Sequence, residues 1–108
     1  MKYEGYVPTH KLPLRPGDVV TIPQGISFKS THPKKGSGVT GRSYKVRVDH
    51  ILNGFKGSAD IGGNTRVTNP EVRWGGAGNY WKWVDINDIR EANLSLFEAR
   101  ERSLNAEV

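Results

Sequence analysis

The alternation of apolar and polar residues along the chain predicts a mainly β protein made of short strands. The clearest strand spans residues 44–52, where every second side chain is expected to face a core. The residues in this phase are Tyr44, Val46, Val48, His50 and Leu52. The alternate positions, including Lys45 and Arg47, are expected to face solvent, and Asn53-Gly54 predicts a tight turn after the strand.

Five further strands and one helix follow from similar patterns. The strands are expected at residues 19–22, 26–29, 71–74 and 80–84, with one more short strand around 66–68. The segments 71–74 and 80–84 flank a glycine-rich stretch and therefore predict a hairpin with a five-residue loop. Ser95 and Glu98 have the spacing of a capping box, which predicts a short helix over residues 93–105.

Residues 30–43 predict a long basic loop that is either mobile or ordered by a ligand. Lys34, Lys35 and Arg42 give this loop its positive charge. Val39 is the one residue of the loop suited to a core. The loop is therefore a candidate contact for phosphate groups.

The glycines of this loop, Gly36, Gly38 and Gly41, fit the G-x-G-x-x-G spacing of dinucleotide-binding loops. That motif needs a strand before it and a helix after it, so that helix amides point at phosphate. Here a polar loop precedes the glycines and a strand follows them. A flexible basic loop that contacts phosphate directly, or a solvated surface loop, is the better interpretation.

Two segments resemble SH3-like small β-barrels. Residues 16–22 resemble the first strand of such barrels, and residues 80–89 resemble their closing strand with the 3₁₀ turn after it. The resemblance implies a small antiparallel barrel over residues 1–92 and a C-terminal helical or frayed tail over 93–108. It implies no catalytic residues, because small barrels host unrelated functions. The glycine content and the tryptophan-rich C-terminal half also resemble small bacteriophage accessory proteins.

The charge distribution adds an electrostatic argument. The chain has 108 residues and a net charge of +5. Residues 1–84 carry +8, from 13 Lys/Arg and 5 Asp/Glu, and residues 85–108 carry −3, from 3 Arg and 6 acidic residues. A basic body attracts an anionic partner such as nucleic acid, a nucleotide or an acidic protein surface, although the same distribution also serves solubility.

Composition excludes several classes of site. The absence of cysteine rules out disulfides and thiolate zinc sites and fits a reducing cytoplasm. His10, His32 and His50 lack metal-ligand spacing, and no local catalytic motif is found, so neither a metal, a cofactor nor an enzyme activity is expected. The apolar runs are too short for a bilayer span or a signal peptide, so no membrane association is expected.

Aromatic residues gather near the predicted hairpin and give a second candidate surface. These residues, with one adjoining cation, are Arg73, Trp74, Tyr80, Trp81 and Trp83. Trp74 and at least one of Trp81 and Trp83 are expected in the core. An exposed aromatic beside a cation is suited either to base stacking or to a protein contact.

Two functions remain open from these observations. The leading hypothesis is a non-enzymatic protein that binds nucleic acid or a nucleotide, with phosphates held by Lys34, Lys35, Arg42, Lys45 and Arg47. The alternative is a phage-type inhibitor or adaptor that binds a host protein through the aromatic hairpin. A homo-oligomer is a further candidate, because a second copy could cover the second aromatic face of the strand 80–84.

Overall fold

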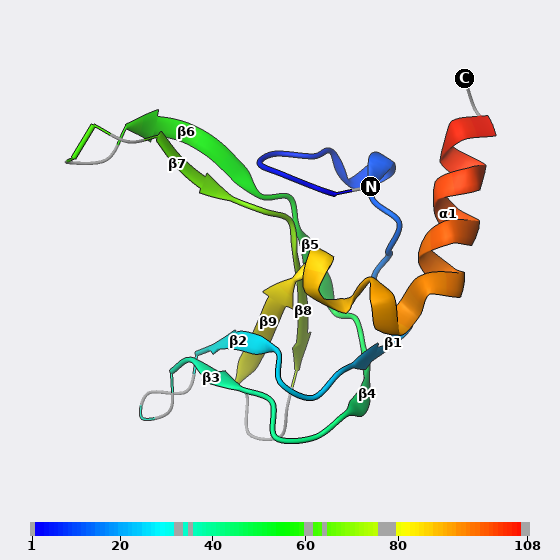
Figure 1. The fold of residues 1–108 in the computed structure, drawn as a ribbon, viewed down its shortest axis with the longest axis horizontal. Coiled ribbons are helices and arrows are strands. Elements are labelled where there is room, and N and C mark those ends of the chain that lie inside the picture. Colours follow the sequence, from blue (N-terminus) through cyan, green and yellow to red (C-terminus); the bar gives the residue numbers. More distant parts are fainter. Residues whose placement is uncertain are drawn as a thin grey trace.

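The computed structural model describes residues 2–31, 34, 36–59, 62–63, 65–75 and 80–106. The strands in this part of the chain are β1 (Val19–Ile22), β2 (Ser27–Ser30), β3 (Gly38–Val39), β4 (Tyr44–Arg47), β5 (His50–Leu52), β6 (Phe55–Ala59), β7 (Thr65–Thr68), β8 (Glu71–Gly75) and β9 (Trp81–Asp85). One α-helix, α1 (Leu94–Ala106), follows them (Figure 1). The 3₁₀ segments are η1 (Thr9–Lys11), η2 (Ile86–Ile89) and η3 (Glu91–Asn93).

The described strands form three antiparallel sheets. The largest has the order β3-β2-β9-β8-β5, and the pairs β1-β4 and β6-β7 form the two others. The prediction of a mainly β fold with a short C-terminal helix is confirmed. Closure into a barrel is not found among these strands, because the three sheets are not joined by a continuous ladder.

The predicted strand 44–52 is two strands, because the chain changes partner at Val48. The amide of Val48 donates to Asp18 O on the β1 side at 2.8 Å, whereas the next amide, of Asp49, donates to Arg73 O on β8 at 2.8 Å. The change of sheet shifts the phase of alternation by one residue. Ile51 is therefore buried, and the prediction that His50 faces the core is wrong, since His50 is exposed.

The turn predicted at Asn53-Gly54 is instead a bend within one long ribbon. β5 leads through this bend into β6, while β7 leads through Asn69-Pro70 into β8 (Figure 1). Gly54 has a φ of +82°, a left-handed conformation that favours glycine. The pair β6-β7 consequently projects from the body as an arm (Figure 1).

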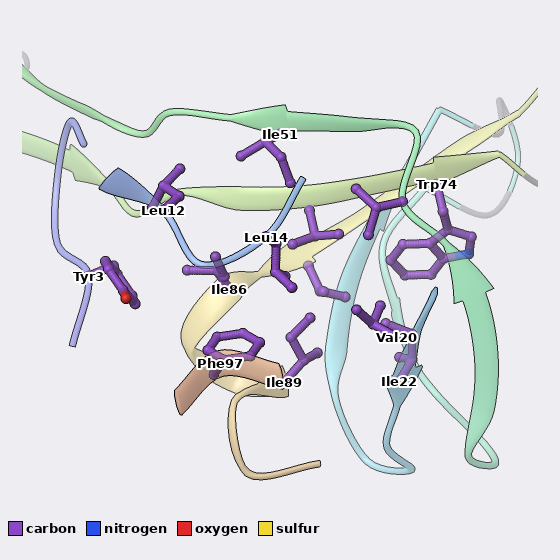
Figure 2. Close-up of a cluster of buried hydrophobic side chains, with 13 residues drawn as sticks. Tyr3, Leu12, Leu14, Val20, Ile22, Ile51, Trp74, Ile86, Ile89 and Phe97 are labelled. Carbon is purple, nitrogen blue, oxygen red and sulfur yellow. The ribbon is translucent and has the colours of Figure 1, made fainter. Parts of the chain in front are cut away.

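The core lies between β1-β4, the inner face of the large sheet, and α1. Figure 2 shows Phe97 of α1 beside Ile86 and Ile89 at one end of this cluster. The N-terminal segment contributes three side chains to the core, those of Tyr3, Leu12 and Leu14. The buried hydrophobic residues are Tyr3, Leu12, Leu14, Val20, Ile22, Val48, Ile51, Val72, Trp74, Val84, Ile86, Ile89 and Phe97. Helix α1 is therefore part of the same core as the strands.

Hydrogen bonds fasten the N-terminal segment to α1. The Tyr3 hydroxyl donates to Glu101 Oε2 at 2.6 Å, and Arg90 Nη2 lies 2.7 Å from Glu101 Oε1. Glu101 is buried, and the Arg90 hydrogen bond outweighs its desolvation, so the pKa of this carboxyl is lowered. Asn87 adds a second attachment, because its side-chain amide exchanges two hydrogen bonds with the backbone of Tyr3.

We expect the Tyr3–Glu101–Arg90 contact to make stability sensitive to acid. Because the folded-state pKa of Glu101 is lowered, its stabilisation is present above the unfolded-state pKa of about 4.3 and is lost as the pH falls through the folded-state value. Glu101→Gln should cost about 1–3 kcal/mol at neutral pH. This variant should also make the stability fall less steeply as the pH is lowered. Urea titrations at several pH values measure both effects. Glu98→Gln, at an exposed position of the same helix, should change neither quantity.

Candidate functional site

The outer face of the large sheet carries both half-buried tryptophans of β9. Cross-strand pairing aligns Lys29, Trp83, Arg73 and His50 in one row across β2, β9, β8 and β5. Trp81 lies one step further along β9, opposite Gly75. We call this surface the outer face, since its side chains alternate with the buried ones of the same strands.

Arg73 and Trp81 form a stacked pair on this outer face. The Arg73 guanidinium carbon lies 4.4 Å from the centroid of the Trp81 ring, within the range of a cation–π interaction. The indole leans over Gly75, where an added Cβ would come 2.8 Å from the ring. Asp49 Oδ2 accepts hydrogen bonds from Arg73 Nε at 3.1 Å and from Nη2 at 2.5 Å, which holds the guanidinium in place. The result is a planar, partly exposed aromatic and cationic surface.

The predicted basic loop leaves the large sheet beside this stacked pair. The Thr31 amide donates to Trp81 O at 3.0 Å, and the Trp81 amide donates to Thr31 Oγ1 at 2.9 Å. Lys34 follows three residues later and is exposed. Lys35 lies outside the described residues. The structure thus brings the beginning of the basic loop to the exposed aromatic end of the hairpin.

Trp74 does not belong to this surface, and its assignment as a contact residue is wrong. It is 3% exposed on the inner face, where its ring meets Tyr44 edge-on at 6.3 Å between centroids. The alternation along β8 explains the difference, since Arg73 and Trp74 point to opposite faces. Tyr80 is half-buried and directly precedes β9.

The remaining predicted phosphate contacts lie on a different sheet. Lys45 and Arg47 are exposed on β4, where they pair with Thr21 and Val19 of β1. Arg42 precedes β4, with its guanidinium carbon 6.0 Å from the centroid of the Tyr44 ring. These three cations therefore do not share the outer face that carries Trp81 and Trp83.

The glycine-rich part of the loop has a structural role in the described residues. Thr40 is buried, with its hydroxyl donating to Pro23 O at 2.7 Å and accepting from the Ile26 amide at 3.0 Å. Gly38 lies under the ring of Phe28, where an added Cβ would come 3.0 Å from the ring. The prediction that Val39 could fill the core is wrong, because Val39 is 63% exposed.

A groove that sequence reasoning missed lies at the other end of the outer face. Its volume is about 590 Å³. The described residues lining it come from β2, β3, the base of the arm, β8, β9 and η2: Ser27, Phe28, Lys29, Ser37, Gly38, Val39, Val67, Thr68, Asn69, Glu71, Trp83, Val84, Asp85 and Asp88. The residues are scattered over six elements, so only the bend at Gly54 and the sheet order bring them together.

Two carboxyl groups in this groove have raised pKa values. Burial raises the pKa of Glu71, while the nearby Lys29 partly counteracts it. Burial likewise raises the pKa of Asp88, and the negative charge of Asp85 adds to the effect. Asp85 itself accepts hydrogen bonds on both oxygens, from Asn87 and from Asn69. The groove therefore concentrates negative charge on an otherwise basic protein.

No family model, curated protein or solved structure matches this chain. The chemistry of the outer face is therefore the basis on which a function can be proposed. Among the described residues, no group of acidic residues and histidines could hold a metal ion. In the same part of the chain, no helix has the length and apolarity needed to span a bilayer.

Proposed function

We propose that the protein is a non-enzymatic binding protein that holds a phosphate-bearing ligand, single-stranded nucleic acid, at the stacked Arg73–Trp81 pair. The observation that carries the proposal is the pair of hydrogen bonds between Thr31 and Trp81. They fix the start of the basic loop beside a planar aromatic and cationic surface. A nucleotide chain needs both features, one for its bases and one for its phosphates.

Stacking supplies the part of the binding that does not depend on sequence. Every base has a flat π face, so an aromatic ring or a guanidinium plane accepts any of them. Such stacking is available only to unpaired bases, which favours a single strand over a duplex. Trp83, two positions along β9, extends the aromatic surface on the same face.

Positive charge supplies the part of the binding that comes from the phosphates. Arg73 is already paired with Asp49, and Lys29 with Glu71, so these cations are partly neutralised on the outer face. The loop adjoining Trp81 carries Lys34 and, in sequence, Lys35. This loop is the proposed phosphate contact because its lysines follow Thr31 closely in the sequence, and neutralising them should release fewer counterions on binding.

The proposal is tested with a labelled single-stranded oligonucleotide in fluorescence anisotropy at about 50 and 200 mM salt. For two phosphate contacts on a single strand, at Lys34 and Lys35, the affinity should fall about sevenfold between these concentrations. Trp81→Ala should weaken binding about 5- to 150-fold, because stacking contributes about 1–3 kcal/mol per base. Tyr6→Ala, which removes an aromatic ring that is 64% exposed on the N-terminal segment, is the matched control.

Two double variants separate the loop from the other basic face. The slope of log affinity against log salt concentration measures how many phosphates are neutralised. Replacing Lys34 and Lys35 by glutamine should reduce this slope by about 0.7 for each phosphate that the loop no longer neutralises. Replacing Lys45 and Arg47 on β4 by glutamine should leave it nearly unchanged. Equal affinities of the Trp81 and Tyr6 variants, or an affinity that does not respond to salt, would contradict the proposal. Competition by a free mononucleotide distinguishes a nucleotide site from a nucleic-acid site.

A further inference from the structure

The groove at the other end of the outer face has walls and a floor suited to an extended chain. Trp83 of β9 lies half-buried among the lining residues. Val39 of β3 and Val67 of the arm, both among the lining residues, are 63% and 48% exposed. Two exposed valines and an indole line this groove and make it apolar. Its volume of about 590 Å³ lies within the usual size range of ligand pockets.

The net negative charge of the groove favours a positively charged ligand. Three carboxylates, from Glu71, Asp85 and Asp88, and one ammonium, from Lys29, lie among the described lining residues. Lys29 Nζ lies 3.7 Å from Glu71 Oε2, and its side chain is 56% exposed, so a bound cation could displace it. Asp85 is held by Asn69 and Asn87, which leaves Glu71 and Asp88 as the carboxylates able to reorganise around a ligand.

The sign of this charge is opposite to that of the whole protein. The chain carries +5, and residues 1–84 carry +8. A cationic peptide is therefore repelled by the molecule at long range, and only a local site can hold it. A lysine or arginine side chain suits such a site, because its aliphatic stem packs on an indole while its charged end meets a carboxylate.

We propose that this groove binds an extended segment of a partner protein through a lysine or arginine side chain that meets Glu71 and Asp88 beside Trp83, with apolar neighbours on Val39 and Val67. The site shares Trp83 with the proposed nucleic-acid surface, but its carboxylates lie away from the Arg73–Trp81 pair. Glu71 pairs with Asp85 at one end of the β8-β9 ladder, whereas Gly75 pairs with Trp81 at the other end. One protein could then hold a basic protein segment and an anionic strand on the same sheet.

The test uses two labelled octapeptides, one alternating lysine and valine and the other alternating glutamate and valine. The lysine peptide should bind the full chain, and the glutamate peptide should not. The double variant Glu71→Gln, Asp88→Asn should weaken the lysine peptide by about tenfold or more, because two carboxylates lose their charge. The matched control is Glu91→Gln, Glu98→Gln, which removes the same charge from exposed positions outside the groove.

Several outcomes would overturn the proposal. One is equal binding of the two octapeptides, and another is equal weakening by the groove variant and its control. Binding of the lysine peptide only to a self-associated form of the protein, seen by light scattering, would instead assign the groove to a second copy of the chain. Thermal melts of each variant exclude unfolding as the cause. The oligonucleotide assay keeps the two proposals separate, since Trp81→Ala should leave the lysine peptide bound and the Glu71, Asp88 variant should leave the oligonucleotide bound.

Discussion

Gly54→Ala should destabilise the protein by more than about 3 kcal/mol. The left-handed conformation at φ +82° costs about 1–2 kcal/mol for a residue with a Cβ. The larger cost comes from overlap, because an added Cβ would lie 2.3 Å from Gly5 O, 2.7 Å from Thr68 O and 2.9 Å from Pro70 N. These are backbone atoms of two segments, at residue 5 and at residues 68–70, so the bend cannot relax without moving the arm. Chemical denaturation of the variant measures the loss.

Gly25→Ala is the matched control for this prediction. Gly25 has the same φ of +82°, but nothing lies within 4 Å of its added Cβ. Its substitution should therefore cost only the conformational part, about 1–2 kcal/mol. Similar losses for Gly25→Ala and Gly54→Ala would mean that close packing at the bend contributes little. If Gly54→Ala remains folded, the lysine octapeptide should bind it more weakly, since the bend carries Val67 to the groove.

Phe97→Ala should cost about 3–5 kcal/mol, which is the range for removing a fully buried aromatic side chain. Phe97 is 0% exposed and packs with Ile86 and Ile89 beneath α1 (Figure 2). It also lies under Arg90, whose guanidinium carbon is 5.6 Å from the ring centroid. The substitution therefore leaves a cavity where α1 meets the rest of the core. A small domain has only about 5–15 kcal/mol of stability, so the loss is a large fraction.

Urea denaturation followed by far-ultraviolet circular dichroism measures this loss. Leu94→Ala, on a side chain that is 38% exposed at the start of the same helix, should cost much less. If Phe97→Ala does not fold, Phe97→Leu keeps most of the buried volume and should retain a measurable transition. A Phe97→Ala variant as stable as Leu94→Ala would show that α1 does not depend on this contact.

Elements with a strong local signal could be predicted from the sequence. The β-branched run at 19–22, the hairpin around the glycine-rich stretch and the C-terminal helix all appear close to their expected bounds. For the first two, the hydrophobic period or the turn agrees with the tertiary structure. The capping box predicted at Ser95 and Glu98 is wrong, because Ser95 lies inside α1 and does not precede it. The helix is confirmed at Leu94–Ala106, one residue later than its expected start.

The errors occur where a long-range contact decides the outcome. Alternation continues through Val48, but whether the next amide bonds to β1 or β8 depends on the packing of two sheets, so the pattern places His50 on the wrong face. Asn53-Gly54 has the composition of a hairpin turn, and only the contacts of Gly54 with distant backbone make it a bend. The short apolar run Leu12-Pro13-Leu14, all three residues buried, is a usable signal for the N-terminal part of the core.

The candidate surface was predictable only in part. The spacing of Arg73 and Trp81 around a glycine-rich loop indicates an aromatic and cationic hairpin, and the structure stacks these two side chains. The separation of Lys45 and Arg47 from that hairpin depends on which sheet β4 joins, which local sequence does not encode. The acidic groove is invisible to local patterns for a similar reason, since its residues come from segments far apart in the chain.

The attachment of Tyr3 has a consequence for how the chain acquires its structure during synthesis. Its two partners, Asn87 and Glu101, are 84 and 98 positions further along the sequence. On a ribosome, Tyr3 must wait for Glu101 of α1 to emerge before this contact can form. Completion of this part of the core is therefore expected only after α1 has been synthesised.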